Sequence, residues 1–279
     1  PFPLAPLPEQ HRIVAEIEKQ FTRLDAAVSA LRRAKANLAR YKAAVLKAAV
    51  EGRLVAQADR PQRSSETSEV SELVSEPASD LLARILAERR RQWEAAHPGK
   101  QYVEPKRPDV AGLGEMPEGW VWATLDQLLT ELKNGFFAKA PESEPPGVPI
   151  LRISAVRPLS VDTTQIRYLR EELTGRITDY LLEKDDLLFT RYNGNLWLVG
   201  VCGSVGEIVS PLIYPDKLIR ARVVQDLVSP KYLEIYFATR VPRQYIESWA
   251  KSTAGQQGIS GEQLRNCPVA FIRSTSSKP

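Results

Sequence analysis

Three short polar segments carry the side chains of this sequence that are best suited to reading another molecule. Residues 191–195 hold an arginine, a tyrosine and two asparagines around a glycine. Residues 251–257 combine a lysine and two hydroxyls with two glutamines, and residues 133–139 combine two lysines and an asparagine with aromatic residues. The candidate contact residues in these segments are Lys133, Asn134, Phe136, Lys139, Arg191, Tyr192, Asn193, Asn195, Lys251, Ser252, Thr253, Gln256 and Gln257.

This mixture of residue types matches the chemistry of nucleic-acid recognition. Arg, Asn and Gln side chains can each make two hydrogen bonds to one base edge, and Lys, Ser and Thr donate to phosphate oxygens. Any one segment could equally be a polar loop without a partner, whereas three together favour a binding surface. Three further candidates, Arg152, Arg220 and Arg222, fall on predicted strands, where arginine is as often a surface ion pair as a phosphate contact.

No known catalytic motif accompanies these segments. The sequence lacks a G-x-G-x-x-G behind a predicted strand, the lysine motif of a phosphate-binding loop and a G-x-S-x-G turn. Residues 203–206 (GSVG) have neither the lysine nor the following helix of a nucleotide loop, so they predict a tight turn between strands. The pair Asp185 and Asp186 predicts a solvated turn rather than a metal site. We therefore expect a non-catalytic protein without a metal or cofactor.

The cysteines, histidines and apolar runs indicate a reducing, aqueous compartment. Cys202 and Cys267 are too few for a disulfide framework, and neither stands at a zinc-ligand spacing from His11 or His97. No apolar run reaches the ~20 residues that span a bilayer, and the start PFPLAPLPEQ lacks the basic-then-apolar order of a signal peptide. We expect a soluble, cytoplasmic protein with no membrane contact.

The charge distribution favours a polyanionic partner only weakly. The net charge is +4 and the sequence pI is about 9.0. Residues 9–56 hold ten Lys and Arg against five Asp and Glu, whereas residues 116–273 hold eighteen of each. A DNA-binding surface in the later segment therefore requires its charges to be sorted onto different faces.

The elements that must position these residues begin with one long predicted helix. Residues 9–53 contain no proline, and no glycine before Gly52, and they are rich in Ala, Leu, Arg, Lys and Glu. Apolar residues recur at heptad spacing, which is typical of a coiled coil. At ~1.5 Å per residue the helix would be roughly 60–70 Å long, too long for a small domain to cover, although part of the stripe could pack within the chain. The predicted helix-pairing residues are Ile13, Ile17, Phe21, Leu24, Val28, Leu31, Leu38, Tyr41 and Val45.

The rest of the chain changes composition several times. Residues 57–78 are rich in Ser and Glu and predict a linker, after which Ser79 should cap a short helix at residues 80–96. Strand candidates then alternate with turns; residues 197–209 are read as one strand. A helix is predicted at 230–248, and Pro242 should kink or restart it.

The sequence thus predicts an α+β fold in which a long coiled-coil helix is joined to a globular mixed α/β domain. The predicted domains are a helix at 1–56, a linker with a short helix at 57–115, a globular domain at 116–273 and a tail at 274–279.

Several stretches together resemble the specificity subunits of type I restriction-modification systems. The longest is PLPEQHRIVAEIEKQFTRLDAAVSALRRAKANLARYKAAVLKAAVEGRL, which looks like the conserved-region helix of that family. Further matching pieces are LLARILAERRRQWE, MPEGWVWATLDQLL, GVPILRIS, LEKDDLLFTRYNGN, VGVCGSVG and GQQGISGEQLRNCPV. The resemblance covers nearly the whole chain apart from the linker and the last ten residues.

The resemblance implies a DNA-recognition subunit without catalytic activity, which directs methylation and restriction by partner methyltransferase and restriction subunits to a target site on double-stranded DNA. It implies that residues 1–56 are a conserved-region helix and that residues 116–273 are a target-recognition domain. Members of the family usually alternate two recognition domains with two helices, whereas this sequence has one of each. We therefore expect a half-length or truncated chain that pairs with a second copy, or with another half, through antiparallel helices.

Two other classes of protein fit part of the pattern. One is a coiled-coil scaffold whose globular domain binds protein, and the other is a stand-alone DNA-binding regulator. Phosphate-driven binding to DNA weakens steeply with salt, which a scaffold would not show. Co-purification with a methyltransferase would separate a specificity subunit from a regulator.

Overall fold

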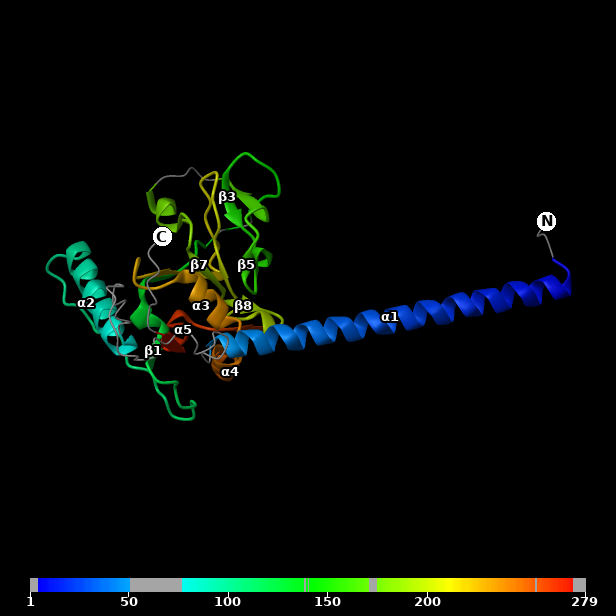
Figure 1. Ribbon diagram of the computed structural model, residues 1–279. Helices are drawn as coiled ribbons and strands as arrows, with labels where there is room; N and C mark the ends of the chain where they lie inside the picture. The colour runs from blue at the N-terminus through cyan, green and yellow to red at the C-terminus, as the bar shows by residue number, and fades with distance from the viewer. Residues whose placement is uncertain are drawn as a thin grey trace, which may run out of the picture. The chain divides into compact units, whose positions relative to one another are not determined.

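The computed structural model describes residues 5–50, 77–137, 139, 141–170, 175–253 and 255–272. The chain divides into two compact units, Pro1–Ala48 and Ala49–Pro279 (Figure 1). Residues 57–76 of the predicted linker and the whole predicted tail at 274–279 lie outside the described residues.

The first unit is a single helix, α1 (Leu7–Val50), of 44 residues. It begins after the proline-rich lead, where the Pro6 carbonyl accepts hydrogen bonds from the backbone amides of Glu9 at 2.9 Å and Gln10 at 3.1 Å. The long predicted helix is confirmed, and it starts two residues earlier than the composition alone indicates. Residues 51–53 of the prediction lie outside the described part of the chain.

The predicted pairing residues of α1 are mostly exposed within this unit. Phe21 is 62% exposed and Leu31 is 70% exposed, whereas Val28 and Val45 are half-buried. An apolar stripe at heptad spacing along one helix is unfavourable in water unless another surface covers it. The exposed stripe is therefore suited to contact with another apolar surface, and pairing with a second helix stays a prediction.

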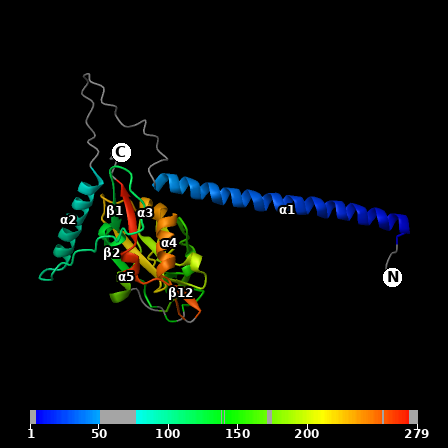
Figure 2. The same cartoon turned by 90° about the horizontal axis from the view of Figure 1, so that it is seen from below.

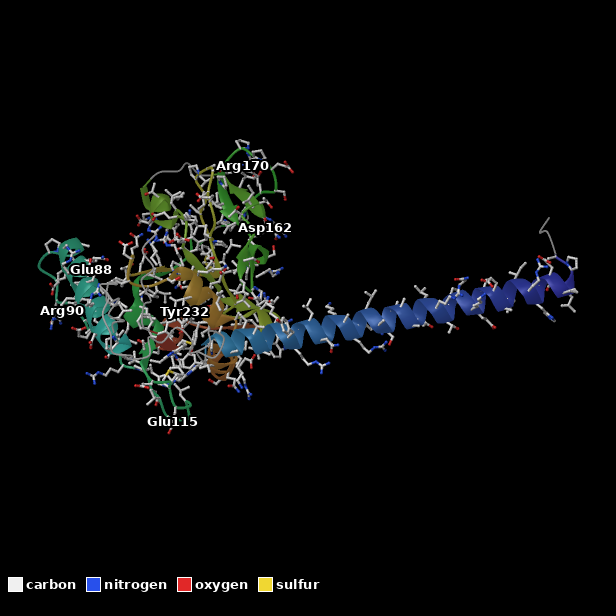
Figure 3. All side chains as sticks on the ribbon, viewed as in Figure 1. Glu88, Arg90, Glu115, Asp162, Arg170 and Tyr232 are labelled. Atoms are coloured by element: carbon white, nitrogen blue, oxygen red, sulfur yellow. The ribbon has the colours of Figure 1, made fainter. Side chains whose placement is uncertain are left out.

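In the second unit, the first helix after α1 in the described residues is α2 (Ala78–Ala96), whose apolar face is buried through Leu81 and Ile85. Arg90 lies on its outer side (Figure 3), whereas Glu88 is partly buried. The prediction that Ser79 caps this helix is wrong: the N-cap residue is Pro77, which offers no side-chain acceptor, and the Ser79 hydroxyl bonds to Asp80 instead.

Three further helices lie near the C-terminus of the described chain: α3 (Pro230–Phe237), α4 (Arg240–Trp249) and α5 (Gly261–Arg265). The predicted helix at 230–248 is interrupted at residues 238–239, ahead of the expected site. Pro242 lies in the first turn of α4, where a missing N–H leaves no intrahelical bond unmade. It is thus compatible with the restarted helix.

A four-stranded antiparallel sheet lies in this unit, with its strands in the order β2-β10-β7-β9; β7 is labelled in Figure 1 and β2 in Figure 2. The strands are β2 (Leu129–Asn134), β10 (Leu218–Val223), β7 (Leu187–Thr190) and β9 (Cys202–Ser204). Alternate residues of a strand face opposite sides. Ile219 accordingly joins the large apolar cluster that includes residues of α2, α3 and α4, while Leu218 joins a second cluster with Leu188 and Tyr214. Both faces of the sheet are therefore covered.

Smaller strands surround the central sheet in the described residues. They are β1 (Trp120–Thr124) paired with β13 (Pro268–Ile272), β3 (Val148–Leu151) with β6 (Ile166–Leu169), β4 (Val156–Arg157) with β5 (Ser160–Val161), and the three-stranded sheet β11 (Lys251–Thr253), β12 (Gln256–Gly258) and β8 (Tyr192–Asn193). Short 3-10 helices are η2 (Leu125–Leu128), η3 (Ile153–Ala155), η4 (Gly175–Tyr180) and η5 (Leu196–Leu198). The mixture of helices and antiparallel strands confirms the predicted α+β class.

Two local predictions fail in this region. Residues 197–209 are not one strand, because the Asn195 side chain caps η5 and turns the chain before β9 begins. Arg152 is not on a strand either; it follows the last residue of β3 and is exposed.

Candidate nucleic-acid interface

Two of the three predicted segments meet in one small sheet. In β12–β8, Gln257 is paired with Asn193 and Gly258 with Tyr192, and β11–β12 joins Lys251 to Gly258. Figure 2 shows β12 at the periphery of the unit. Arginine, amide and lysine side chains that are far apart in the sequence are thus carried by neighbouring strands.

Glycine permits this arrangement at β12. A Cβ atom on Gly258 would stand 2.2 Å from the Tyr192 ring, so the ring lies directly over the glycine backbone. The Ile259 amide donates to the Arg191 carbonyl at 3.0 Å and continues the pairing. Any side chain at residue 258 would displace the ring or separate the strands.

The third segment is joined to the first through the turn at residues 214–218. The Phe136 amide donates to the Tyr214 carbonyl and the Asp216 amide to the Phe136 carbonyl, both at 2.9 Å. The Arg191 amide donates to the Lys217 carbonyl at 2.8 Å. A Cβ atom on Gly135 would stand 2.1 Å from the carbonyl oxygen of the same turn, so this close approach also requires glycine. All three predicted segments therefore converge on one region.

Arg191 occupies the middle of this region with much of its hydrogen-bonding capacity unused. Its guanidinium lies over the Tyr192 ring, 4.7 Å from the centroid, and Nη1 donates to the Asp216 carbonyl at a long 3.5 Å. Its buried Nε has no hydrogen-bond partner, and the guanidinium forms no ion pair with a carboxylate of the described residues. Tyr192 thus holds the plane of the guanidinium, and Nη2 makes no hydrogen bond within the described residues.

The two asparagines use their oxygens locally. Asn193 Oδ1 accepts from the Asn195 amide, and Asn195 Oδ1 accepts from the Trp197 amide, each at 3.0 Å. Neither Nδ2 group has a partner among the described residues, and Asn195 is exposed. The two local hydrogen bonds therefore fix the orientations of these amides. The Asn195 side chain lies at the exposed surface, and the Asn193 side chain is half-buried.

The remaining candidates in the three segments differ in exposure. Asn134, Lys139, Lys251 and Gln256 are exposed, and Gln257 is half-buried. The side chains of Ser252 and Thr253 lie outside the described part of the structure.

Phe136 has a structural role, since it packs edge-on against Tyr180 with centroids 5.4 Å apart and contacts an apolar cluster.

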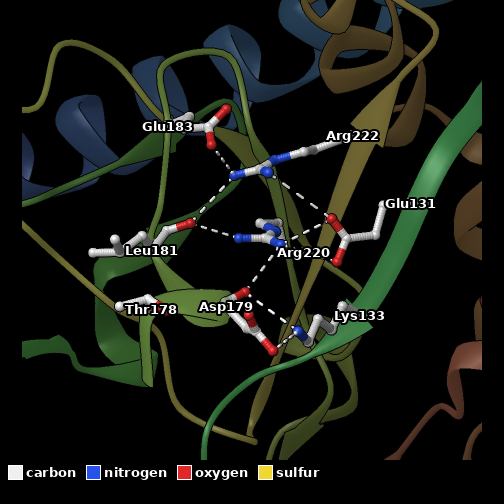
Figure 4. Close-up of a pocket in the computed structure, with 8 residues that line it drawn as sticks. All are labelled: Glu131, Lys133, Thr178, Asp179, Leu181, Glu183, Arg220 and Arg222. Atoms are coloured by element: carbon white, nitrogen blue, oxygen red, sulfur yellow. Dashed lines mark hydrogen bonds and ion pairs between the residues drawn. The ribbon is translucent and has the colours of Figure 1, made fainter. Parts of the chain in front are cut away.

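Arg220 and Arg222 lie elsewhere, in a pocket lined by charged residues (Figure 4). Arg220 is 2% exposed, and its Nη2 donates to both Glu131 carboxylate oxygens, at 3.0 and 2.9 Å. Arg222 is paired with Asp186 at 2.7 Å and with Glu183 at 2.9 Å. Both guanidinium groups are paired with carboxylates of the protein, and contact of these arginines with DNA stays a prediction.

Lys133 belongs to the same pocket. Its Nζ lies 3.5 Å from an Asp179 carboxylate oxygen and 4.6 Å from the centroid of the Tyr180 ring. The pocket network holds the carboxylates of Glu131, Asp179, Glu183 and Asp186 against Lys133, Arg220 and Arg222. With at least as many negative as positive groups, this region does not form a phosphate footprint. The proposed DNA-binding surface therefore does not include Lys133, Arg220 or Arg222.

Asp186 also departs from the sequence expectation. It is 2% exposed and not a solvated turn residue. Burial raises the pKa of its carboxyl, although hydrogen bonds from Arg222 and from the Glu183 amide lower it. The expected turn lies at Asp185, whose φ of 68° is left-handed.

Other groups considered for chemistry are structural. Cys202 and Cys267 are free thiols and buried, at 3% and 0% exposure. Within the described residues no group of three or more His, Cys, Asp and Glu could hold a metal ion. Gly203 packs against the β5 backbone, where a Cβ atom would stand 2.4 Å from the Ser160 oxygen. In the described ranges no helix is long and apolar enough to cross a membrane.

The sequence analysis did not identify Trp197 as an exposed aromatic residue. Trp197 was read as part of a strand, but it lies on η5 and is 69% exposed. The signal was the preceding Asn195, whose side chain favours a turn two residues on.

The chain thus joins one long helix, whose apolar stripe is mostly exposed, to an α+β unit that carries the three polar segments. By sequence, the chain is similar to specificity subunits of type I restriction enzymes. It is 46% identical over 143 residues to the type I restriction enzyme EcoKI specificity subunit of Escherichia coli (strain K12), covering 51% of this chain and 30% of that protein. It is 28% identical over 262 residues to the Escherichia coli EcoEI specificity subunit, covering 92% of this chain and 41% of that one. The chain therefore spans less than half the length of these relatives.

Two solved structures align with most of the chain at low identity. The HsdS subunit from Thermoanaerobacter tengcongensis aligns with 98% of this chain and 48% of its own, at 16% identity and a TM-score of 0.37. A chain of a type I R-M system aligns with 97% of this chain and 49% of its own, at 17% identity and a TM-score of 0.44. No family model matches the sequence.

Proposed function

We propose that this chain is a specificity subunit, or a portion of one, that reads a double-stranded DNA sequence and directs type I methylation and restriction to it. The observation that carries the proposal is that strand pairing brings residues 192–193, 251–253 and 256–258 into one small sheet, and that the turn at residues 214–218 links Phe136 to Arg191. The relationship to known specificity subunits supports it. In this account residues 116–273 are the target-recognition domain and residues 57–115 connect it to the helix at residues 1–56.

The proposed reading surface combines two kinds of contact. Arg191 and the amides of Asn193, Asn195 and Gln257 are positioned for base edges, because these groups can donate or accept in pairs. Lys139 and Lys251, which form no ion pair in the described residues, are suited to phosphate oxygens. Gln256 and Asn134 flank this set.

The proposal also assigns partners. The exposed stripe of α1 pairs in antiparallel fashion with a second copy, or with the helix of another half, and the assembly recruits methyltransferase and restriction subunits. The chain itself supplies no catalytic group or cofactor in this account and works in the cytoplasm.

Salt titration of duplex binding tests the DNA-reading function. The full chain should bind duplex DNA with an affinity that falls linearly on a logarithmic scale as salt rises, since phosphate contacts release counterions. Replacing Lys251 and Lys139 by Ala together should reduce the slope by about two. Absence of any duplex affinity at low salt would contradict the proposal and favour a scaffold.

Co-expression tests the assignment to a type I system. A tagged chain should retain a type I methyltransferase subunit through purification, and the double variant Leu24→Lys, Leu31→Lys is a test of whether α1 contributes. Specific DNA binding without such retention would instead describe a regulator.

A further inference from the structure

We propose that Trp197 is a further specificity-determining residue of this interface, whose indole ring makes an apolar contact with the DNA bases. The inference rests on the proposed function. The polar segments supply hydrogen bonds and charge, but DNA readers also use apolar side chains, either against the C5 methyl group of thymine or as wedges between base steps.

Trp197 is one of three aromatic residues of this unit that are exposed within the described part of the chain: it is 69% exposed, Phe137 is 77% exposed and Trp249 is 47% exposed. Trp120 and Trp122, by contrast, are half-buried and pack against the large apolar cluster. A tryptophan left in water forgoes the burial of a large apolar surface, which contact with a partner would recover. Because single exposed apolar residues are common on protein surfaces, it is the position of Trp197 beside the polar segments that points to a contact.

The backbone around Trp197 is held from several sides. The Trp197 amide donates to Asn195 Oδ1 at 3.0 Å, and the Leu198 carbonyl accepts from the Thr190 hydroxyl. The Val199 carbonyl accepts from Arg243 Nη1 at 2.6 Å. These bonds tie η5 to the end of β7 and to α4, so the turn that presents the ring is fixed on the folded core.

Gly200 completes this support. Its φ is 67°, and a Cβ atom there would stand 2.7 Å from Ile246 of α4. The chain can therefore turn sharply after η5 and pack against the helix. The exposure of Trp197 follows from a firmly held turn rather than from a loosely attached loop.

The place of this turn identifies DNA as the partner. Trp197 lies two residues after Asn195, and the same asparagine that offers a free Nδ2 donor also caps the turn that carries the indole. The ring is thus continuous with the segment that β8 and β12 bring together. Asn195 acts as a positioning residue for Trp197 in addition to its proposed base contact.

Variants of the full chain test this inference on a duplex that the unchanged protein has selected from a random pool. Trp197→Ala should weaken binding to that duplex by about tenfold, as loss of one good base contact would, and Trp197→Phe should retain part of the affinity. The matched control is Val209→Ala, which removes a fully exposed apolar side chain outside the three segments and should leave affinity unchanged. Thermal unfolding should be the same for all four proteins.

The duplex then distinguishes the two forms of contact. If the ring contacts the methyl group of a thymine, replacement of that thymine by uracil should weaken binding of the unchanged protein. The same replacement should not weaken binding of Trp197→Ala, and replacement of the other thymines should have no effect on either protein. If the ring is a wedge, the bend of the DNA measured by energy transfer should be lost in Trp197→Ala and uracil should have no effect.

Equal affinity and equal base preference in Trp197→Ala would overturn this inference and leave the proposed function intact. Loss of a protein partner with unchanged DNA binding would overturn it as well, because it would make Trp197 a protein contact. If the unchanged chain selects no sequence, the proposed function and this inference both fail.

Discussion

Arginine serves two different purposes in the α+β unit. Arg220 and Arg222 face carboxylates and stabilise the fold around η4 and β10, whereas Arg191 faces none within the described residues and rests on an aromatic ring. A planar guanidinium stacked in this way is already oriented for a base edge and loses little freedom on binding. The functional difference between these residues lies in their neighbours rather than in their type.

Arg191→Ala is expected to weaken binding to the preferred duplex by roughly 1–3 kcal/mol and to relax preference at one base position. The measurement is affinity for a panel of duplexes that differ at single positions. Arg176→Ala, which removes an exposed arginine outside the three segments, is the control. Uniform weakening across the panel would reduce Arg191 to a phosphate contact.

The cysteines give a prediction about reactivity. Burial raises the pKa of both the Cys202 and the Cys267 thiol, so they stay protonated near neutral pH, and the thiolate is the reactive form. Neither should be alkylated by iodoacetamide in the folded protein, and both should react in urea. Mass spectrometry of the treated protein measures this, and rapid labelling of either residue under native conditions would contradict the described core.

At the scale of elements, the interface depends on a small sheet built from distant parts of the chain. β8 follows β7 of the central sheet, while β11 and β12 come between α4 and α5. The sheet has few residues, so its geometry depends on the close packing of Tyr192 on Gly258. Disturbing that contact should affect all the base-reading groups together.

Gly258→Ala should therefore reduce DNA affinity and lower the free energy of unfolding by about 1–3 kcal/mol, because the new methyl group collides with the Tyr192 ring. Gly206→Ala is the matched control, since a Cβ atom there meets nothing within 4 Å. Urea unfolding and duplex binding measure the two effects. Equal behaviour of the two variants would show that the packing at Gly258 is unimportant.

Helix α1 supports a separate prediction at this scale. Leu24→Lys together with Leu31→Lys should abolish pairing while the α+β unit stays folded, because two charges are placed on the apolar stripe. Ala30→Lys together with Asn37→Lys adds the same charges away from the stripe and should leave pairing intact. Sedimentation at micromolar concentration measures the outcome, and a monomeric unchanged protein would rule out helix pairing.

The sequence allowed some elements to be predicted and not others, for identifiable physical reasons. Helix α1 follows from local propensity and heptad spacing, which need no tertiary information. The meeting of residues 193 and 257 depends on long-range strand pairing, so the sequence could nominate both segments but not their contact. Likewise, the alternation of residues along β10 predicts that Arg220 faces one side of the sheet. It does not predict the ion pair between Arg220 and Glu131 on the neighbouring strand β2.

At the scale of the whole molecule, the proposed function implies that the recognition domain described here reads one half-site. If two chains pair through antiparallel helices, a twofold axis relates their domains, and the preferred DNA should be an interrupted palindrome. The length of α1 would then set the spacing between the two half-sites.

Deletion of one heptad, residues 27–33, should shift each domain by roughly 10 Å, about three base pairs of helical rise. The preferred spacer should shorten while the half-site sequence is unchanged. Selection with the deleted and the full helix compares the two spacers directly. An unchanged spacer, or a consensus with a single block, would show that α1 does not act as the ruler between two copies.

Selection of bound duplexes from a random pool by the full chain is the most direct test of the central claim, that the α+β unit reads DNA sequence. The account predicts a defined consensus that is enriched strongly over the starting pool. The Arg191→Ala variant should lose the base preference at one position of this consensus, whereas the Arg176→Ala control should retain the whole consensus. A bound pool as random as the starting pool, recovered at a salt concentration where the chain does bind DNA, would contradict the claim.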